Sequence, residues 1–438
     1  MEKRYDEHYI RSITQMGDSQ CVVTSQAIFT SRNIKLIDKG VKVDSALFER
    51  LISHKLMPKI DQCLTVENGI SAESLKHYAM NLLDNDPGLV VLRGDARVRG
   101  RMLRAFDEMP LIEPMAFKLT VARSQRPEVF DHSLRVALVT LFLAIKSFSF
   151  STRELAALAA AAVFHDIGIL HVSPELLRPG RRLEKSERHH LYAHPISGFL
   201  ILREFAEYHP EISRTVFEHH ERLDGSGYPR GLKAEQICPG AQVLMLTEAA
   251  ITIFEQSPQS KNLARFSVLL RLNQKKFNSE AINCLLSLVR DMQLDDDPSD
   301  AQAAAFSSVP TLEARLKEVS RVFQEWNATR RQRRTDTETV RSGAPLVSII
   351  DERIDDLHRM LLHAGFDVSN PGILIAILQE DPEAMVELNF LLGEARWQLR
   401  EIIHEVHRRL EERGGSAADV ETLALEWIER NETAIEQL

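Results

Sequence analysis

Histidine and acidic residues gather in one part of this chain, at spacings typical of a metal site. Nine of the sixteen histidines lie between residues 132 and 220. The densest groups are His165-Asp166, His194-Pro195, His219-His220-Glu221 and the run DGSGYP from Asp224 to Pro229. Imidazole and carboxylate ligands suit iron, manganese or zinc, and these groups contain no thiolate that would favour zinc.

Two features of the same region favour metal binding over a plain acidic surface. Glu128 precedes His132 by four residues, so in a helix the two side chains would share one face. His165-Asp166 ends a long apolar stretch, where a buried imidazole and carboxylate would be costly without a compensating cation. A carboxylate beside an imidazole can bridge two ions. Several ions together are well suited to hydrolysing a phosphate ester, because they position a bridging hydroxide and neutralise the leaving oxygen.

The order of these groups resembles the HD-GYP branch of the HD phosphohydrolases, bacterial enzymes that hydrolyse cyclic di-GMP. The chain reads E-x-x-x-H at 128–132, HDIG at 165–168, H-P-x-x-G at 194–198 and HHERLDGSGYPRGL at 219–232. The last run is a long and specific match, and the resemblance covers roughly residues 120–290. It implies a bundle of helices with the metal site at its centre.

The resemblance also implies two or three divalent ions, iron or manganese, and a role for each matching residue. The implied metal ligands are Glu128, His132, His165, Asp166, His194, His219, His220 and Glu248. Glu248 stands where the family has an aspartate, and its additional methylene would move the oxygen by about 1 Å. His165 and Asp166 would act in catalysis, with Asp166 bridging the ions. Tyr228 would face the substrate, in a turn that Asp224 and Gly227 shape.

Positions that bind the substrate phosphates in the family differ in this chain. The family's lysine after HDIG is replaced by Ile169, and its basic R-P-Y-R-like segment reads SPQS at residues 257–260. Arg230, Lys233 or Lys261 could supply the missing positive charge. The sequence therefore predicts a nearly complete metal centre that lacks most of the basic residues with which the family binds the substrate phosphates.

Several of these residues also have plainer interpretations. Glu128 could be a solvated glutamate at a helix start, and Glu248 could be a simple substitution on an apolar helix. We expect His189 and His190 at the surface, and His171 and His209 in structural roles. Residues 225–227, GSG, match neither a nucleophile elbow nor a phosphate-binding loop.

The elements that must position the site are mostly helices. Ser151 and Glu154 form a capping box ahead of LAALAAAAVF, which predicts a helix that begins at residue 151 and leads to His165. Earlier in the chain, residues 21–30 and 34–43 alternate as two strands would, Asp44 predicts a helix start, and another helix is expected at 72–84. The expected fold class is mainly α, with a central HD-type helical bundle, a small N-terminal α+β unit and a C-terminal helical region.

Changes in composition divide the chain into four segments. Residues 1–97 would form the α+β domain and residues 98–292 the phosphohydrolase-like domain. An acidic linker and a connecting helix are expected at 293–345, followed by a helical domain at 346–438.

Composition also limits the class of protein. The net charge of −9 argues against a general nucleic-acid or anionic-membrane binder. The basic run at 330–334 fits a solvated helix end better than a nucleic-acid site. The four cysteines are widely spread, as in a reduced cytoplasmic protein, and the first residues lack the apolar core of a signal peptide. The longest apolar stretches are too short to cross a bilayer.

The leading hypothesis is a metal-dependent phosphodiesterase that opens cyclic di-GMP by attack of metal-activated hydroxide on phosphorus. Because these phosphate-binding basic residues are missing, two alternatives stay open. One is a regulatory or scaffold module with little or no turnover, and the other is a phosphohydrolase with a different phosphate-ester substrate. The sequence also leaves open a homodimer and a protein partner that binds the C-terminal helical region.

Overall fold

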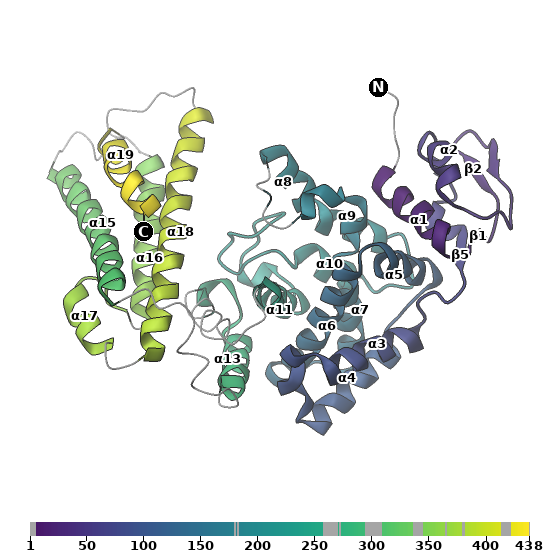
Figure 1. Ribbon diagram of the computed structural model, residues 1–438, viewed down its shortest axis with the longest axis horizontal. Helices are drawn as coiled ribbons and strands as arrows, with labels where there is room; N and C mark the ends of the chain where they lie inside the picture. Colours follow the sequence, from purple (N-terminus) through teal and green to yellow (C-terminus); the bar gives the residue numbers. More distant parts are fainter. Residues whose placement is uncertain are drawn as a thin grey trace. The chain divides into compact units, whose positions relative to one another are not determined.

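The chain folds into two compact units built mainly of helices (Figure 1). The computed structural model describes residues 6–178, 181, 184–256, 270, 273–293, 309–335, 345–363, 366–378, 382–412 and 422–437. The first unit comprises residues 6–256 and 275–288, and the second includes the helices from residue 309 onward. The expected fold class, mainly α, is confirmed. Within the segment expected to contain the acidic linker and connecting helix, 293–345, residues 294–308 and 336–344 lie outside the described residues.

The first 70 residues combine short strands with helices. Strand β1 (Val22–Thr24) pairs antiparallel with β5 (Leu64–Val66), while β2 (Ile28–Thr30) pairs with both β3 (Lys35–Ile37) and β4 (Leu56–Met57). The stretch at 21–30 is therefore two strands instead of the single one expected, because its two halves join different sheets.

Three helices accompany these strands: α1 (Glu7–Ser19), α2 (Phe48–Ile52) and α3 (Ala72–Asn85). Asp44 accepts a hydrogen bond from the backbone N–H of Ala46 and caps the short turn that leads into α2, as its expected role requires. Helix α3 matches the helix expected at 72–84.

A bundle of longer helices follows and contains the candidate site. Its helices are α4 (Ala96–Glu108), α5 (Glu113–Gln125), α6 (Pro127–Ser147), α7 (Thr152–Phe164), α8 (Lys185–Tyr192), α9 (His194–Leu202), α10 (Pro210–Glu218), α11 (Pro239–Gln256) and α13 (Ser279–Gln293). The capping box expected at Ser151 and Glu154 is present at the start of α7. Helix α7 packs against α4, α6 and α10, and α11 packs against α6 and α10.

The tight turn after α7 brings two parts of the site together. This turn, η4 (Ile167–His171), packs against α9. A Cβ atom added to Gly168 would lie 2.2 Å from the backbone oxygen of His194, so only glycine allows this approach. The close contact places Asp166, at the start of the turn, beside His194.

The N-terminal region packs on the bundle and belongs to the same compact unit. Helix α1 contacts α5 and η4, and α3 contacts α4 and α6. At this junction the buried Lys118 lies 3.0 Å from Asp61 and 3.9 Å above the ring of Tyr9. A buried ammonium group is costly unless it is paired, so Asp61 and Tyr9 of the N-terminal region compensate the charge of Lys118 in the bundle. The domain boundary at residue 97 stays a prediction.

One helical stretch is long and apolar enough to cross a membrane by length and composition alone. It is Thr152–His171, and 83% of its apolar window is buried inside the unit. Because α7 packs against three neighbouring helices, this composition is that of a core helix.

The second unit is a helical bundle with its own apolar core. Its helices are α15 (Val309–Thr335), α16 (Pro345–His363), α17 (Pro371–Leu378), α18 (Pro382–Glu412) and α19 (Thr422–Gln437). Trp326 and Trp427 meet in this core with ring centroids 5.0 Å apart. Arg330, the first residue of the basic run, pairs with Asp351 and Asp355 of α16.

Candidate metal centre

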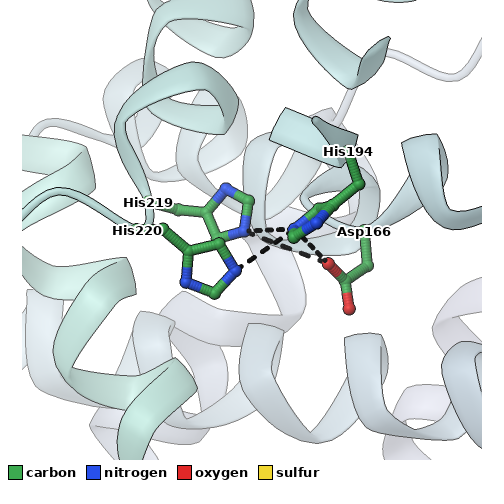
Figure 2. Close-up of side chains that lie close together, drawn as sticks. All are labelled: Asp166, His194, His219 and His220. Atoms are coloured by element: carbon green, nitrogen blue, oxygen red, sulfur yellow. Dashed lines mark hydrogen bonds and ion pairs between the residues drawn. The ribbon is translucent and has the colours of Figure 1, made fainter. Parts of the chain in front are cut away.

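Seven of the eight expected metal ligands lie in two clusters of the first unit. The first cluster consists of Asp166, His194, His219 and His220 (Figure 2), and the second of His132, His165 and Glu248. Within each cluster, one ligand-type atom from every residue lies within 4.8 Å of the others. The eighth residue, Glu128, is exposed in the first turn of α6 and belongs to neither cluster.

Helix ends position most of these side chains. His165 and His219 end α7 and α10, His194 begins α9, and each imidazole is buried. His132 and Glu248 project instead from within α6 and α11, which pack against each other. A buried hydrogen bond of 2.7 Å between Thr140 and Thr247 ties these two helices together. The packing of α6, α7, α9, α10 and α11 therefore brings both clusters to one place.

Backbone carbonyls orient three of the imidazoles. The Nδ1 atoms of His165, His194 and His219 lie 2.7, 2.7 and 2.6 Å from the carbonyl oxygens of Ala162, Leu191 and Val216. A carbonyl oxygen only accepts, so each Nδ1 must carry the hydrogen. In the neutral ring the lone pair then lies on Nε2, and this atom faces the cluster in each case.

The converging atoms of the first cluster fit a cation. Nε2 of His194 lies 3.3 Å from Nε2 of His219, 3.2 Å from Nε2 of His220 and 3.1 Å from Oδ1 of Asp166. Lone pairs at these separations repel one another unless a positive charge lies between them. Ligand atoms about 2.1 Å from one ion and roughly at right angles would be about 3 Å apart. The residues present therefore fit a divalent ion.

Electrostatics keep two of these imidazoles in the form that binds metals. Burial, together with the nearby His194, lowers the pKa of His220 to about 3. Burial and the neighbouring His220 hold the pKa of His219 well below its usual value. Both rings are therefore neutral at physiological pH, as metal ligands must be.

The second cluster is built around the carboxylate of Glu248. Its Oε2 atom lies 2.8 Å from Nε2 of His132 and 3.2 Å from Nε2 of His165. His165 Nε2 is buried and makes no hydrogen bond within the part of the chain that the structure describes. Burial opposes the charged form of His132, but Glu248 and Glu255 outweigh burial and raise the pKa of His132 to about 11. This cluster therefore strongly favours a positive charge.

Asp166 connects the two clusters. Its Oδ1 atom faces His194 at 3.1 Å, and its Oδ2 atom lies 3.5 Å from Nε2 of His165. The two oxygens of one carboxylate thus point toward different ligand sets, which is the geometry that a bridging ligand between two ions requires.

Aromatic rings extend outward from the first cluster. The ring of Tyr228 stacks on His220, with centroids 4.7 Å apart and planes at 22°. Tyr192, at the end of α8, stacks on the other side of Tyr228 at 4.5 Å and 20°. Tyr192 is 44% exposed, so the stack runs from a cluster ligand to the surface.

Two acidic residues shape the turn that holds Tyr228. Glu221 is fully buried and accepts hydrogen bonds from the backbone N–H groups of Arg230 and Leu232. Asp224 accepts from the backbone N–H of Ser226, and a Cβ on Gly227 would lie 2.4 Å from the backbone of Glu221. Asp224 and Gly227 are therefore placed to form the turn, with no room for a side chain at residue 227.

Two of the cations expected to bind substrate phosphate lie in the described part of the chain, and one of them is engaged elsewhere. The guanidinium of Arg230 pairs with the buried Glu218 at 2.5 Å, and Lys233 is exposed. Ile169, which replaces the family's lysine, is buried at 7% exposure. Residues 257–261, which include Lys261, lie outside the described residues.

Two charged residues near the clusters were not identified from the sequence. Arg222 lies over the ring of Phe277; burial lowers its pKa, and the nearby Tyr228 and Glu248 act in the opposite direction. Glu255 contacts His132 directly. The signals were available, because Arg222 lies inside the HHERLDG run and Glu255 follows Glu248 by seven residues on one helix face.

Comparison with known proteins adds to this geometry. The HD domain family matches residues 121–264. The 3′3′-cGAMP-specific phosphodiesterase 3 of Vibrio cholerae is 25% identical over 177 residues, which are 40% of this chain and 38% of that protein. The cyclic di-GMP phosphodiesterase of Thermotoga maritima is 30% identical over 164 residues, which are 34% of this chain and 44% of that protein. This chain thus spans less than half the length of these relatives.

A solved structure, Bd1817, a HDG"Y"P protein from Bdellovibrio bacteriovorus, aligns with 64% of this chain at 13% identity and a TM-score of 0.35. That score is too low to bear on the fold. The family match, the relatives and the HHERLDGSGYP run support one assignment. Residues 121–264 of this chain match the HD domain family, and this region is similar to cyclic-dinucleotide phosphodiesterases.

Proposed function

We propose that this protein is a metal-dependent phosphodiesterase that hydrolyses cyclic di-GMP. The observation that carries the proposal is the position of Asp166 between two clusters of metal-type ligands. One carboxylate shared by two ligand sets is the arrangement used by two-metal phosphoesterases. We place the reaction in the cytoplasm, as the spread of the four cysteines suggests.

Each cluster would hold one divalent ion, iron or manganese. Nitrogen and oxygen donors without a thiolate suit these metals. Bound ions supply an activated hydroxide and neutralise the charge that develops on the phosphate. His194, His219 and His220 would hold one ion, and His132, His165 and Glu248 the other. Glu128, the remaining expected ligand, is exposed and lies outside both clusters.

The aromatic stack favours a substrate that carries nucleobases over a simple phosphate ester. Tyr192 and Tyr228 present parallel rings beside the first cluster. A purine can stack on such a platform, and stacking of one base contributes about 1–3 kcal/mol. The relatives named above act on 3′3′-cGAMP and cyclic di-GMP, both cyclic dinucleotides with purine bases. We propose that one purine of the substrate stacks on the outer face of Tyr192.

Arg222 would take part of the role of the missing phosphate-binding cations. Burial lowers the pKa of its guanidinium, while the nearby Tyr228 and Glu248 raise it, so Arg222 lies close to both residues. Arg230 would have to leave Glu218 to bind substrate, and Lys233 could reach it only from the exposed turn. The alternative is a regulatory module with little turnover, and the buried Ile169 is the observation that favours it. Homodimer formation and partner binding by the second unit stay predictions.

The test is hydrolysis by the purified chain of residues 1–438. The protein is loaded anaerobically with Fe(II) or Mn(II), incubated with cyclic di-GMP or 3′3′-cGAMP, and the products are separated by chromatography. We expect a linear dinucleotide or mononucleotides that form only with metal, and no product from the double variant His165→Ala, Asp166→Ala. Metal-loaded protein that leaves both dinucleotides intact would contradict the proposal and favour the regulatory module.

A further inference from the structure

His132 is held differently from the other oriented histidines of the site. His165, His194 and His219 each direct Nδ1 at a backbone carbonyl three residues earlier in the chain. These acceptors are fixed by the helix itself. The Nδ1 atom of His132 instead lies 2.7 Å from Oε2 of Glu255, a side chain from another helix and 123 residues away in the sequence. On its Nδ1 side, His132 is therefore held by a single carboxylate.

Glu255 is in turn held by a chain of ion pairs. Its Oε1 atom lies 3.1 Å from Nη1 of Arg135, and Nε of Arg135 lies 2.7 Å from Oδ2 of Asp86. Arg135 follows His132 by three residues on α6, so the two side chains lie on the same face. Asp86 caps the turn that follows α3. The contacts form one continuous path from Asp86 through Arg135 and Glu255 to His132.

The opposite side of the imidazole faces the second cluster. Nε2 of His132 lies 2.8 Å from Oε2 of Glu248. If Glu255 accepts the Nδ1 hydrogen, Nε2 is left with its lone pair directed at the place where the ion would lie. Carboxylates that accept the second N–H of a ligand histidine fix its tautomer and ring orientation in many metal sites, and losing one costs about 10- to 100-fold in metal affinity.

We propose that Glu255 is a positioning residue that fixes His132 for metal binding and so completes the second of the two ion sites. The inference rests on the metal centre of the proposed function, but not on its substrate. In the described contacts Glu255 touches His132 of the second cluster and no residue of the first cluster, so we expect it to act mainly on the second ion. Because its side chain is 34% exposed, it can be replaced without opening the core.

Two substitutions separate positioning from a simple ion pair. Glu255→Gln keeps an oxygen that can accept the Nδ1 hydrogen but removes the charge that pairs with Arg135. Glu255→Ala removes both. If Glu255 matters only as the partner of Arg135, the two variants behave alike. If it positions His132, Glu255→Gln keeps most of the affinity for the second ion that Glu255→Ala loses.

The experiment is a titration of the metal-free chain (residues 1–438) with Mn(II), in which electron paramagnetic resonance measures the free ion at each step. We expect two ions for the wild type. Glu255→Ala should bind the first ion normally and the second about 10- to 100-fold more weakly. Glu255→Gln should bind the second ion several-fold more tightly than Glu255→Ala. The control Glu73→Ala removes an exposed carboxylate in the first turn of α3 and should bind both ions as the wild type does.

Circular-dichroism melting of each variant is the control that checks whether it is folded at the temperature of the titration. An unchanged second ion in Glu255→Ala would overturn the inference, as would equal losses in the alanine and glutamine variants. A wild type that binds one ion also overturns it. None of these results depends on hydrolysis, so a failure of the cyclic di-GMP assay with two ions bound would count against the proposed function and not against this inference.

Discussion

Oδ1 of Asp166 lies 3.1 Å from Nε2 of His194, on the side of the carboxylate that faces the first cluster. The other oxygen, Oδ2, faces His165 of the second cluster at 3.5 Å. The relationship depends on the turn after α7, where Gly168 lets the chain approach α9. An apolar helix and a glycine turn therefore place Asp166 between the two clusters.

Replacing Asp166 by asparagine should uncouple the two sites. An amide offers one ligand oxygen instead of two and carries no charge, so it cannot bridge two cations. We expect the variant to retain about one ion per chain and to lose hydrolysis by on the order of a thousandfold or more. Plasma mass spectrometry of the metal and a dinucleotide assay measure the two effects. Asp38→Asn, on an exposed turn, is the matched control. Full activity in Asp166→Asn would contradict the bridging role.

The two ion sites should respond differently to pH. The pKa of His132 is raised to about 11, so at neutral pH an ion must displace its proton and binding strengthens as pH rises. The pKa of His220 is lowered to about 3, so this ligand is already neutral. We expect affinity for the second ion to rise by up to about tenfold per pH unit between pH 6 and 8. Affinity for the first ion should change little. Titrations at pH 6, 7 and 8 that give equal slopes would contradict this assignment.

Substitution of Tyr192 should distinguish a base-stacking platform from a structural contact. Tyr192→Ala removes the outermost ring of the stack, and we expect KM for the cyclic dinucleotide to rise about tenfold or more. Tyr192→Phe keeps the ring and should stay close to the wild type. Hydrolysis of bis(p-nitrophenyl) phosphate, which has no nucleobase, should be the same in all three proteins. An equal loss on both substrates would mean that Tyr192 only supports the fold of the site.

Gly168 should be far less tolerant of alanine than a glycine in open space. A Cβ at residue 168 would collide with the backbone of His194, and relieving such overpacking costs about 1–3 kcal/mol. We expect Gly168→Ala to lower the free energy of unfolding by this amount and to weaken metal binding at the first cluster. Gly100, on α4, has no atom within 4 Å of an added Cβ, so Gly100→Ala should be neutral or stabilising. Urea denaturation of both variants measures the difference. Equal unfolding free energies would show that the turn can relax.

The sequence predicted the parts of this protein that depend on local patterns. The capping box at Ser151 and Glu154 and the apolar run after it are sufficient to place α7 and the histidine at its end. Strands β4 and β5 were not predicted, because runs of two or three residues carry no periodicity and depend on distant partners. The splitting of residues 21–30 between two sheets has the same origin.

In the candidate site, too, the sequence predicted what local motifs determine and missed what depends on contacts between distant segments. Motif order was enough to select residues that the fold brings together, such as His132 and Glu248, which are 116 positions apart. It did not reveal Glu255, because a glutamate on a helix is usually a solvated residue and its contact with His132 is set by the packing of α6 against α11. It also could not show that Arg230 is engaged with the buried Glu218, since that pairing depends on how the turn folds back on α10.

The most direct test of the account is to locate the ions. Crystals of the wild-type chain grown with Mn(II) should show two anomalous-scattering peaks about 3.5–4 Å apart, the spacing of two-metal phosphoesterase sites. We predict one peak among His194, His219 and His220, the other among His132, His165 and Glu248, and the carboxylate of Asp166 between them. A single peak, or two peaks that do not share Asp166, would contradict the account.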